Sequence, residues 1–150
     1  MNQPAGTADA VAEVEALQHA LMRIYSDSVE KNLDQVMEFF ADGAEMRQFD
    51  VMTPREFNGR EFRDHFVELA ANYSGKVEVI DLRVDATAEM AFSSCIQHTW
   101  GTAPNGQPFD MSFRVTDCLK KIGGKWKIVH EHVSFPIDMK TGKADFQSKP

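Results

Sequence analysis

Hydrophobic residues near the start of the chain recur at the spacing of amphipathic helices. From Asp9 onward they fall three or four residues apart, at Val14, Leu17, Leu21 and Ile24. This spacing puts apolar side chains on one face of a helix. Residues 33–40 repeat the pattern over a shorter length, and Gly43 after them is a natural C-terminal cap. We therefore expect two helices before the first strand.

The clearest helix start in the sequence lies at Asn58. Asn58 can cap a helix, and Glu61 follows three residues later, as in a capping box. Phe57 and Phe62 flank this start as the two sides of a hydrophobic staple. Since residues 44–50 before it have the pattern of a short strand, the first half of the chain predicts helix, helix, strand and helix.

From residue 76 onward the hydrophobic period changes to two, which is typical of β-strands. Strands are expected over residues 76–84, 90–102, 109–120 and 126–135. The apolar parity switches between Val79 and Ile80, which predicts a bulge that bends the first of them. Gly123 and Gly124 predict a tight hairpin before the last strand. Helices followed by a meander of strands indicate an α+β fold, with the sheet curled around the helices as a cone.

The length of the chain predicts one folded domain. It has 150 residues, of which 43% are hydrophobic and 26% are charged, and these values are typical of globular proteins. We expect a flexible lead-in over residues 1–8, the folded domain over residues 9–136, and a polar C-terminal tail over residues 137–150.

The formal net charge of −7 argues against two classes of partner. An acidic surface repels both nucleic acid and anionic membranes. The sequence shows no signal peptide and no apolar run long enough to span a membrane. Cys95 and Cys118 both lie in predicted strands, which favours a reducing compartment over a disulfide scaffold. We therefore expect a cytoplasmic protein that binds neither nucleic acid nor membranes.

Three short segments carry a recognisable pattern. They are FFADGA at residues 39–44, NGRE at residues 58–61 and GKWKIVHEHVS at residues 124–134. Together they resemble the SnoaL-like group of the nuclear-transport-factor-2-like superfamily, which includes ketosteroid isomerase. The resemblance implies a cystatin-like cone of N-terminal helices on a curved, antiparallel or mixed sheet. It also implies a homodimer and a pocket for a small hydrophobic ligand, although members of this group differ in activity.

Asp117 is the sharpest chemical anomaly in the sequence. It shares its strand parity with apolar residues such as Phe113 and Val115. On an inner face, desolvation would raise its pKa and keep it protonated as a hydrogen-bond donor. The family resemblance matches it with the carboxylic acid in the oxyanion hole of ketosteroid isomerase. The alternative is an ion pair with a cation at the edge of the sheet or at an interface.

Glu131 is a second candidate catalytic residue. It lies between Val129 and Val133 on the last predicted strand, and the family register turns all three toward the pocket. Glu131 could act as a general base or pair with a cation in the pocket. The alternative is a solvated charge near the end of the sheet.

The general base of the isomerase has no direct equivalent here. The position that matches it is Gln48, whose amide cannot abstract a proton. Asp50 has the same strand parity and could replace it. His65, at the border of its helix's apolar stripe, could serve as an acid–base group or as a partly buried structural histidine.

The remaining pocket-lining candidates are mostly large side chains. The full set comprises Tyr25, Gln48, Phe66, Trp100, Met111, Phe113, Val129 and Val133. Aromatic residues at strand spacing serve packing more often than they form a ligand cage. Tyr25 is one residue beyond the position of the isomerase's tyrosine donor, which Ile24 occupies.

We expect neither a metal nor a cofactor. His98, His130 and His132 could share one face of the sheet, but no further ligand stands at a spacing typical of zinc sites. The sequence contains no phosphate-binding glycine loop and no nucleophile elbow.

Two classes of function stay open at this point. One is a cofactor-independent enzyme that moves a proton on a small hydrophobic substrate, giving isomerisation, dehydration or cyclisation. The other is a non-catalytic domain that binds a small molecule or dimerises, which needs no paired acid and base.

Overall fold

The structure is a computed structural model that describes residues 5–28, 32–52, 56–73 and 75–148 of the chain. Within these ranges the helices are α1 (Ala5–Ser28), α2 (Leu33–Met37), α3 (Gly59–Asn72) and the short 3-10 helix η1 (Gly43–Glu45). The strands are β1 (Arg47–Phe49), β2 (Glu56–Asn58), β3 (Gly75–Ala86), β4 (Met90–Thr102), β5 (Pro108–Ile122), β6 (Lys125–Ser134), β7 (Ile137–Asp138) and β8 (Lys143–Ala144). None of these helices combines the length and the apolar character that a membrane span requires.

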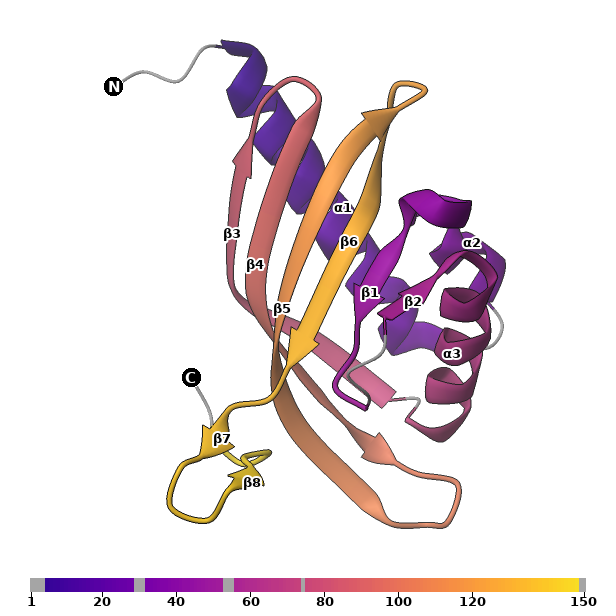
Figure 1. The fold of residues 1–150 in the computed structure, drawn as a ribbon, viewed down its shortest axis with the longest axis vertical. Helices are drawn as coiled ribbons and strands as arrows, with labels where there is room; N and C mark the ends of the chain where they lie inside the picture. Colours follow the sequence, from indigo (N-terminus) through magenta and orange to yellow (C-terminus); the bar gives the residue numbers. More distant parts are fainter. Residues whose placement is uncertain (1–4, 29–31, 53–55, 74, 149–150) are drawn as a thin grey trace.

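Six of the described strands form one mixed sheet, in the order β2-β1-β6-β5-β4-β3 (Figure 1). Neighbouring strands run antiparallel, except that β1 and β6 run parallel. β7 and β8 pair separately as a small hairpin. This arrangement confirms the predicted α+β class with a mixed sheet.

The core lies where α1 packs on the sheet, and α2 and α3 lie beside β1 and β2 (Figure 1). Val14 and Leu21, from the predicted apolar stripe, are buried there. Leu119 of β5 and Ile128 of β6 belong to the same cluster. Burial of each such side chain contributes about 1.5–3 kcal/mol, so this contact between helix and sheet is the main apolar interface of the fold.

Two register shifts curve the sheet. One lies in β3 between Ile80 and Arg83, close to the predicted parity switch. Asp81 within it has a φ of 51°, in the left-handed region that few side chains adopt. The second shift lies in the pairing of β5 with β6, between Cys118 and Leu119. Because a bulge bends its strand and increases the local twist, these shifts help the long strands to wrap around the helices.

Secondary structure extends into both of the segments that the sequence assigns to the ends of the chain. α1 begins at Ala5, within the expected lead-in, and residues 1–4 lie outside the described part. The expected polar tail contains the β7–β8 hairpin, and its last residues, 149–150, also lie outside the described part. Phe146 follows this hairpin and packs edge-on against Phe135 at 4.6 Å between ring centroids. This aromatic contact packs the mostly polar C-terminal segment against the residue that follows β6.

α3 begins next to the predicted Asn58, but for a different local reason. Asn58 occupies the N-cap position without a capping hydrogen bond from its side chain. Instead it ends β2, where it pairs with Arg47 of β1. Pairing with β1 therefore holds Asn58 in the extended geometry that precedes the helix.

Candidate active site

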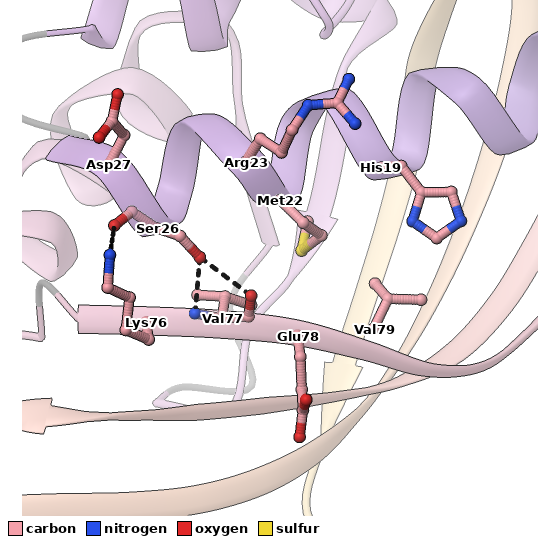
Figure 2. A pocket seen from close by; sticks show the side chains of 9 residues that line it. All are labelled: His19, Met22, Arg23, Ser26, Asp27, Lys76, Val77, Glu78 and Val79. Carbon is pink, nitrogen blue, oxygen red and sulfur yellow. Dashed lines mark hydrogen bonds between the residues drawn. The ribbon is translucent and has the colours of Figure 1, made fainter.

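A groove of about 610 Å³ lies between α1 and β3, and its polar groups serve the fold (Figure 2). Ser26 Oγ lies 2.9 Å from both the backbone nitrogen and the backbone oxygen of Val77. Lys76 Nζ donates to Ser26 O at 3.1 Å. Figure 2 shows that Arg23 and Asp27 point away from β3. The hydrogen bonds in this groove therefore hold α1 against β3, and its polar groups do not converge on one point where a ligand could bind.

A second cavity of about 550 Å³ lies between the concave face of the sheet, the helices and the residues that flank the C-terminal hairpin, Phe135, Phe146 and Gln147. Its apolar lining is dominated by what we call the aromatic wall: Tyr25, Phe66, Tyr73, Phe109, Phe113, Phe135 and Phe146. Its polar lining includes Gln48, Asp50, Gln97, Thr99 and Glu131. A mostly apolar cavity with a few convergent polar groups is the usual form of a small-molecule site.

Asp117 lies buried directly behind this cavity, on the inner face that its strand parity predicts. Its side chain is only 2% exposed. Its Oδ2 accepts a hydrogen bond of 2.7 Å from Gln18 Nε2, which also donates to Ser93 Oγ at 3.0 Å. Gln18 lies on α1 between Val14 and Leu21, so the apolar stripe itself carries the amide into the core.

Glu131 lies opposite Asp117 in the register of β5 and β6. It lines the cavity, and its Oε1 accepts a hydrogen bond of 2.7 Å from Gln48 Nε2. Gln48, which cannot act as a base, therefore supports the carboxyl group that can.

The two carboxyl groups are buried together, and each influences the ionisation of the other. Burial raises the pKa of Asp117, and the Gln18 hydrogen bond only partly offsets this effect. Burial also raises the pKa of Glu131, and the negative charge of Asp117 raises it further. Asp117 Oδ1 is buried beside Glu131, and a hydrogen bond between the two carboxyl groups lowers the pKa of Asp117 and raises that of Glu131. Near neutral pH the pair therefore holds a proton, and it titrates as a unit.

Tyr25 lines the same cavity although it is one residue beyond the family position. Its ring lies 5.5 Å from that of Phe66 on α3. Burial raises the pKa of the Tyr25 phenol well above its usual value, and the charges of Glu131 and Asp117 add to the effect. Tyr25 therefore stays neutral and can donate a hydrogen bond to a ligand.

Asp50 and His65 come together beside the cavity. His65 Nε2 lies 3.4 Å from Asp50 Oδ2, an ion-pair distance without the alignment of a hydrogen bond. Asp50 lines the cavity and accepts a hydrogen bond of 2.8 Å from the backbone nitrogen of Met52. His65 does not line it, and its ring stacks on Phe57 with centroids 4.0 Å apart. The four predicted catalytic residues thus form two neighbouring pairs, linked by the effect of the Asp50 charge on Glu131.

Most of the predicted pocket-lining residues do line this cavity. They are Tyr25, Gln48, Phe66, Met111, Phe113 and Val133. Trp100 does not, because it pairs with Asp110 on the opposite face of the sheet and stacks on His98 at 4.7 Å. Val129 does not line it either, because the register shift beside it leaves it out of the ladder and packs it against the core.

Sequence reasoning missed the polar residues on the inner face of β4. Ser93, Gln97 and Thr99 are all buried, and Gln97 and Thr99 line the cavity. Their common parity with Ala91 and Cys95, which are also buried, is the signal that could have found them.

The three histidines considered for a metal are engaged elsewhere. His98 contacts Glu78 and Asp110, each at 2.9 Å. His130 Nδ1 lies 3.0 Å from Arg47 O. In the described ranges, no three His, Cys, Asp or Glu side chains are grouped as a metal site would require.

Solved structures with the same architecture differ widely in their described roles. An NTF2-like protein of unknown function from Pseudomonas putida KT2440 is 24% identical, with a TM-score of 0.81 over 96% of this chain and 99% of that one. A candidate dehydratase of the NTF2-like family from Streptomyces avermitilis is 15% identical, with a TM-score of 0.72 over 85% and 97%. The association domain of C. elegans CaMKII is 15% identical, with a TM-score of 0.67 over 87% and 99%. At these identities the likeness establishes the fold alone.

At the level of sequence, no curated protein matches the chain. The SnoaL-like domain, in contrast, matches residues 17–138. This match runs from within α1 to the end of β7, so it includes both pairs of candidate catalytic residues and most of the cavity. Because this match covers most of the chain, the protein belongs to the SnoaL-like domain family, and its fold is that of the NTF2-like structures.

Proposed function

We propose that the protein is a cofactor-independent enzyme that moves a proton on a small hydrophobic molecule, in an isomerisation, dehydration or cyclisation. The observation that carries this proposal is the Asp117–Glu131 pair beside an apolar cavity. Because burial raises the pKa of both groups, and the charge of Asp117 raises that of Glu131 further, the pair can take up or release a proton near neutral pH. A general acid or base works best when its pKa lies close to the working pH.

Each candidate residue has a separate role in this proposal. Glu131 lines the cavity, so it is the group that would exchange a proton with the ligand. Asp117 lies behind Glu131 and acts through it, as a positioning residue that shares the proton. Tyr25, as a neutral donor in the same cavity, would stabilise a developing oxyanion. Asp50 and His65 would form a second acid–base pair nearby.

The proposal is tested by proton exchange on a hydrophobic ketone. The purified protein is incubated in deuterated buffer with 2-tetralone, and deuterium uptake beside the carbonyl is followed by NMR. We expect exchange above the buffer rate, and we expect Glu131→Gln to lower the enzymatic rate by about 10²–10⁴-fold, the usual contribution of a general base.

A matched variant controls for charge. Glu15→Gln removes one carboxylate from the exposed surface of α1 and should leave the exchange rate unchanged. Circular dichroism then establishes that both variants are folded. Exchange by folded Glu131→Gln at the wild-type rate would refute the role of Glu131.

The second candidate function is a non-catalytic domain that associates with itself. The outer face of β4 exposes Met90, Phe92 and Trp100 to 56%, 48% and 37%. This apolar surface favours a homodimer, and one structural neighbour is the association domain of C. elegans CaMKII. Sedimentation velocity should then give a dimer for the wild type and a monomer for Phe92→Glu. A monomeric wild type would remove the support for association.

The proposed location is the cytoplasm. Cys95 and Cys118 are both free thiols, which persist in a reducing compartment. Burial raises the pKa of the Cys95 thiol to about 12, so this residue is a packing group and not a nucleophile. Alkylation of the native protein with iodoacetamide should therefore leave Cys95 unmodified.

A further inference from the structure

The charge lining the proposed site is one-sided. Among the described residues that line the 550 Å³ cavity, none is Lys, Arg or His, whereas Asp50, Asp110 and Glu131 are acidic. The Asp110 carboxylate pairs with His98 on the other face of the sheet, so Asp50 and Glu131 are the acidic groups that can face a ligand. His65, which lies behind Asp50 at 3.4 Å and does not line the cavity, is the basic group nearest to them among the described ion pairs. An anionic ligand would meet two carboxyl groups and no described cation, which is an unfavourable environment for a buried negative charge.

The polar atom that lacks a partner here is an acceptor. Gln48 lines the cavity, is only 2% exposed, and uses its Nε2 to donate to Glu131. Its Oε1 is buried with no hydrogen-bond partner among the described residues. A buried acceptor without a donor is unfavourable, and a ligand N–H group would satisfy this oxygen if the Gln48 amide turned it toward the cavity.

The aromatic wall adds a second source of attraction for a cation. The ring centroids of Tyr25 and Phe66 lie 5.5 Å apart, and those of Phe113 and Phe135 lie 5.9 Å apart. The faces of aromatic rings carry partial negative charge, and they attract ammonium groups most strongly when water is excluded. Aromatic rings and carboxyl groups, with no Lys, Arg or His among the described residues of the lining, favour amines over neutral molecules.

We propose that the ligand of this cavity is a small aromatic or aliphatic amine, bound with its ammonium group toward Gln48, Asp50 and Glu131. The ammonium donates to the two carboxyl groups, and the apolar body lies against the aromatic wall. This inference names the substrate class of the proposed enzyme and rests on the same site. The evidence for the amine, however, is the charge of the residues that line the cavity, whereas the evidence for the enzyme is the acid–base pair.

Binding of such a cation also changes the state of the acid–base pair. Asp117 and Asp50 are the charges that, after burial, raise the pKa of Glu131. A ligand ammonium beside Glu131 opposes that repulsion and favours the carboxylate. Glu131 then releases its proton to solvent, and the ammonium pairs with the carboxylate that forms. The ligand would in this way convert Glu131 into the base that the proposed reaction needs.

Three ligands with one apolar body test the charge preference. They are 2-(2-naphthyl)ethylamine, 2-(2-naphthyl)ethanol and 2-naphthylacetate, which are cationic, neutral and anionic at neutral pH. Calorimetric titration of the full chain should give about tenfold tighter binding of the amine than of the alcohol, in line with a cation–π and ion-pair contribution. The acetate should bind more weakly than the alcohol. Titration of the amine in phosphate and in Tris buffer should detect proton release.

Variants at two aspartates separate local from general electrostatics. Asp50→Asn should lower the preference for amine over alcohol several-fold and leave the affinity for the alcohol unchanged. Asp85→Asn, on the exposed face of β3, makes the same change in net charge and should leave both affinities unchanged. Circular dichroism establishes that each variant is folded.

Several outcomes would overturn the amine proposal. They are equal or tighter binding of the alcohol or the acetate, an unchanged preference in folded Asp50→Asn, and no binding of any of the three at millimolar concentration. The proposed enzyme fails separately. If the amine is preferred but Glu131→Gln keeps full exchange activity, the acid–base function is wrong and the amine site stands.

Discussion

Neutralising the buried carboxyl pair tests the electrostatics of the site without any ligand. Burial raises the pKa of Asp117 from 3.8 to about 7, and burial with repulsion from Asp117 raises that of Glu131 from 4.5 to about 8. At a pH between the pKa values of the unfolded chain and those of the folded protein, the folded protein keeps protons that the unfolded chain has lost. The stability that these groups contribute is therefore fully present below the unfolded pKa values and is lost as pH rises toward the folded ones.

The size of this loss follows from the number of protons retained. One retained proton corresponds to a slope of about 1.4 kcal/mol per pH unit. If the pair retains a single shared proton, the free energy of unfolding falls by about 3 kcal/mol between about pH 5 and pH 7. This is a large share of the 5–15 kcal/mol that is typical of a folded domain. The double variant Asp117→Asn/Glu131→Gln keeps the side-chain shapes and removes this slope.

Urea unfolding at about pH 5, 6 and 7, followed by the fluorescence of buried Trp126, measures the slope directly. Glu78, and then Asp110, raise the pKa of His98. The stability that His98 contributes to the fold is therefore also lost as the pH rises above 6.5. His98 is present in both proteins, and the difference between wild type and double variant isolates the pair. Parallel stability profiles for the two proteins, or a wild type that gains stability up to pH 7, would refute the reasoning.

Two further substitutions test the packing of the site and of the core. Gln18→Leu removes the donor to Asp117 and Ser93, so it should cost about 1–3 kcal/mol at pH 8 and less at pH 5, where protonated Asp117 needs no donor. Equal losses at both pH values in urea titrations would contradict this account. Phe62→Ala should cost about 3–5 kcal/mol because Phe62 is 2% exposed, whereas Met139→Ala, at an 89% exposed position, should be near neutral. Thermal unfolding of both variants compares them, and similar losses would count against the assigned core.

Local sequence patterns predicted which side chains of a helix or strand face the core, because that depends on periodicity. The three-four spacing of α1 placed Val14 and Leu21 in the core, and the alternation of β5 placed Asp117 on the inner face. Both predictions succeeded because side-chain direction follows directly from helical and strand geometry. The same rule, applied to Gln18, would have found the donor to Asp117, since Gln18 lies on the stripe itself.

Register decided what alternation could not. Trp100 was assigned to the cavity because it is large and aromatic, but its pairing with Asp110 turns it to the other face. Val129 was assigned by extending the parity of Glu131 across a register shift that the sequence does not reveal. A slip of one residue moves a side chain to the opposite face of a sheet, so neither position could be placed without the pairing.

By itself, then, the sequence determined the class of the fold, the order of its helices and long strands, and the inward direction of one carboxyl group, but not β2, β7 or β8. Only the tertiary structure joined Asp117 to Glu131, Gln48 to Glu131, and Asp50 to His65. The physical reason is range, because helical and strand periodicity is set by neighbouring residues. Proton sharing and charge selection instead depend on atoms that meet only when distant segments pack around one enclosed space.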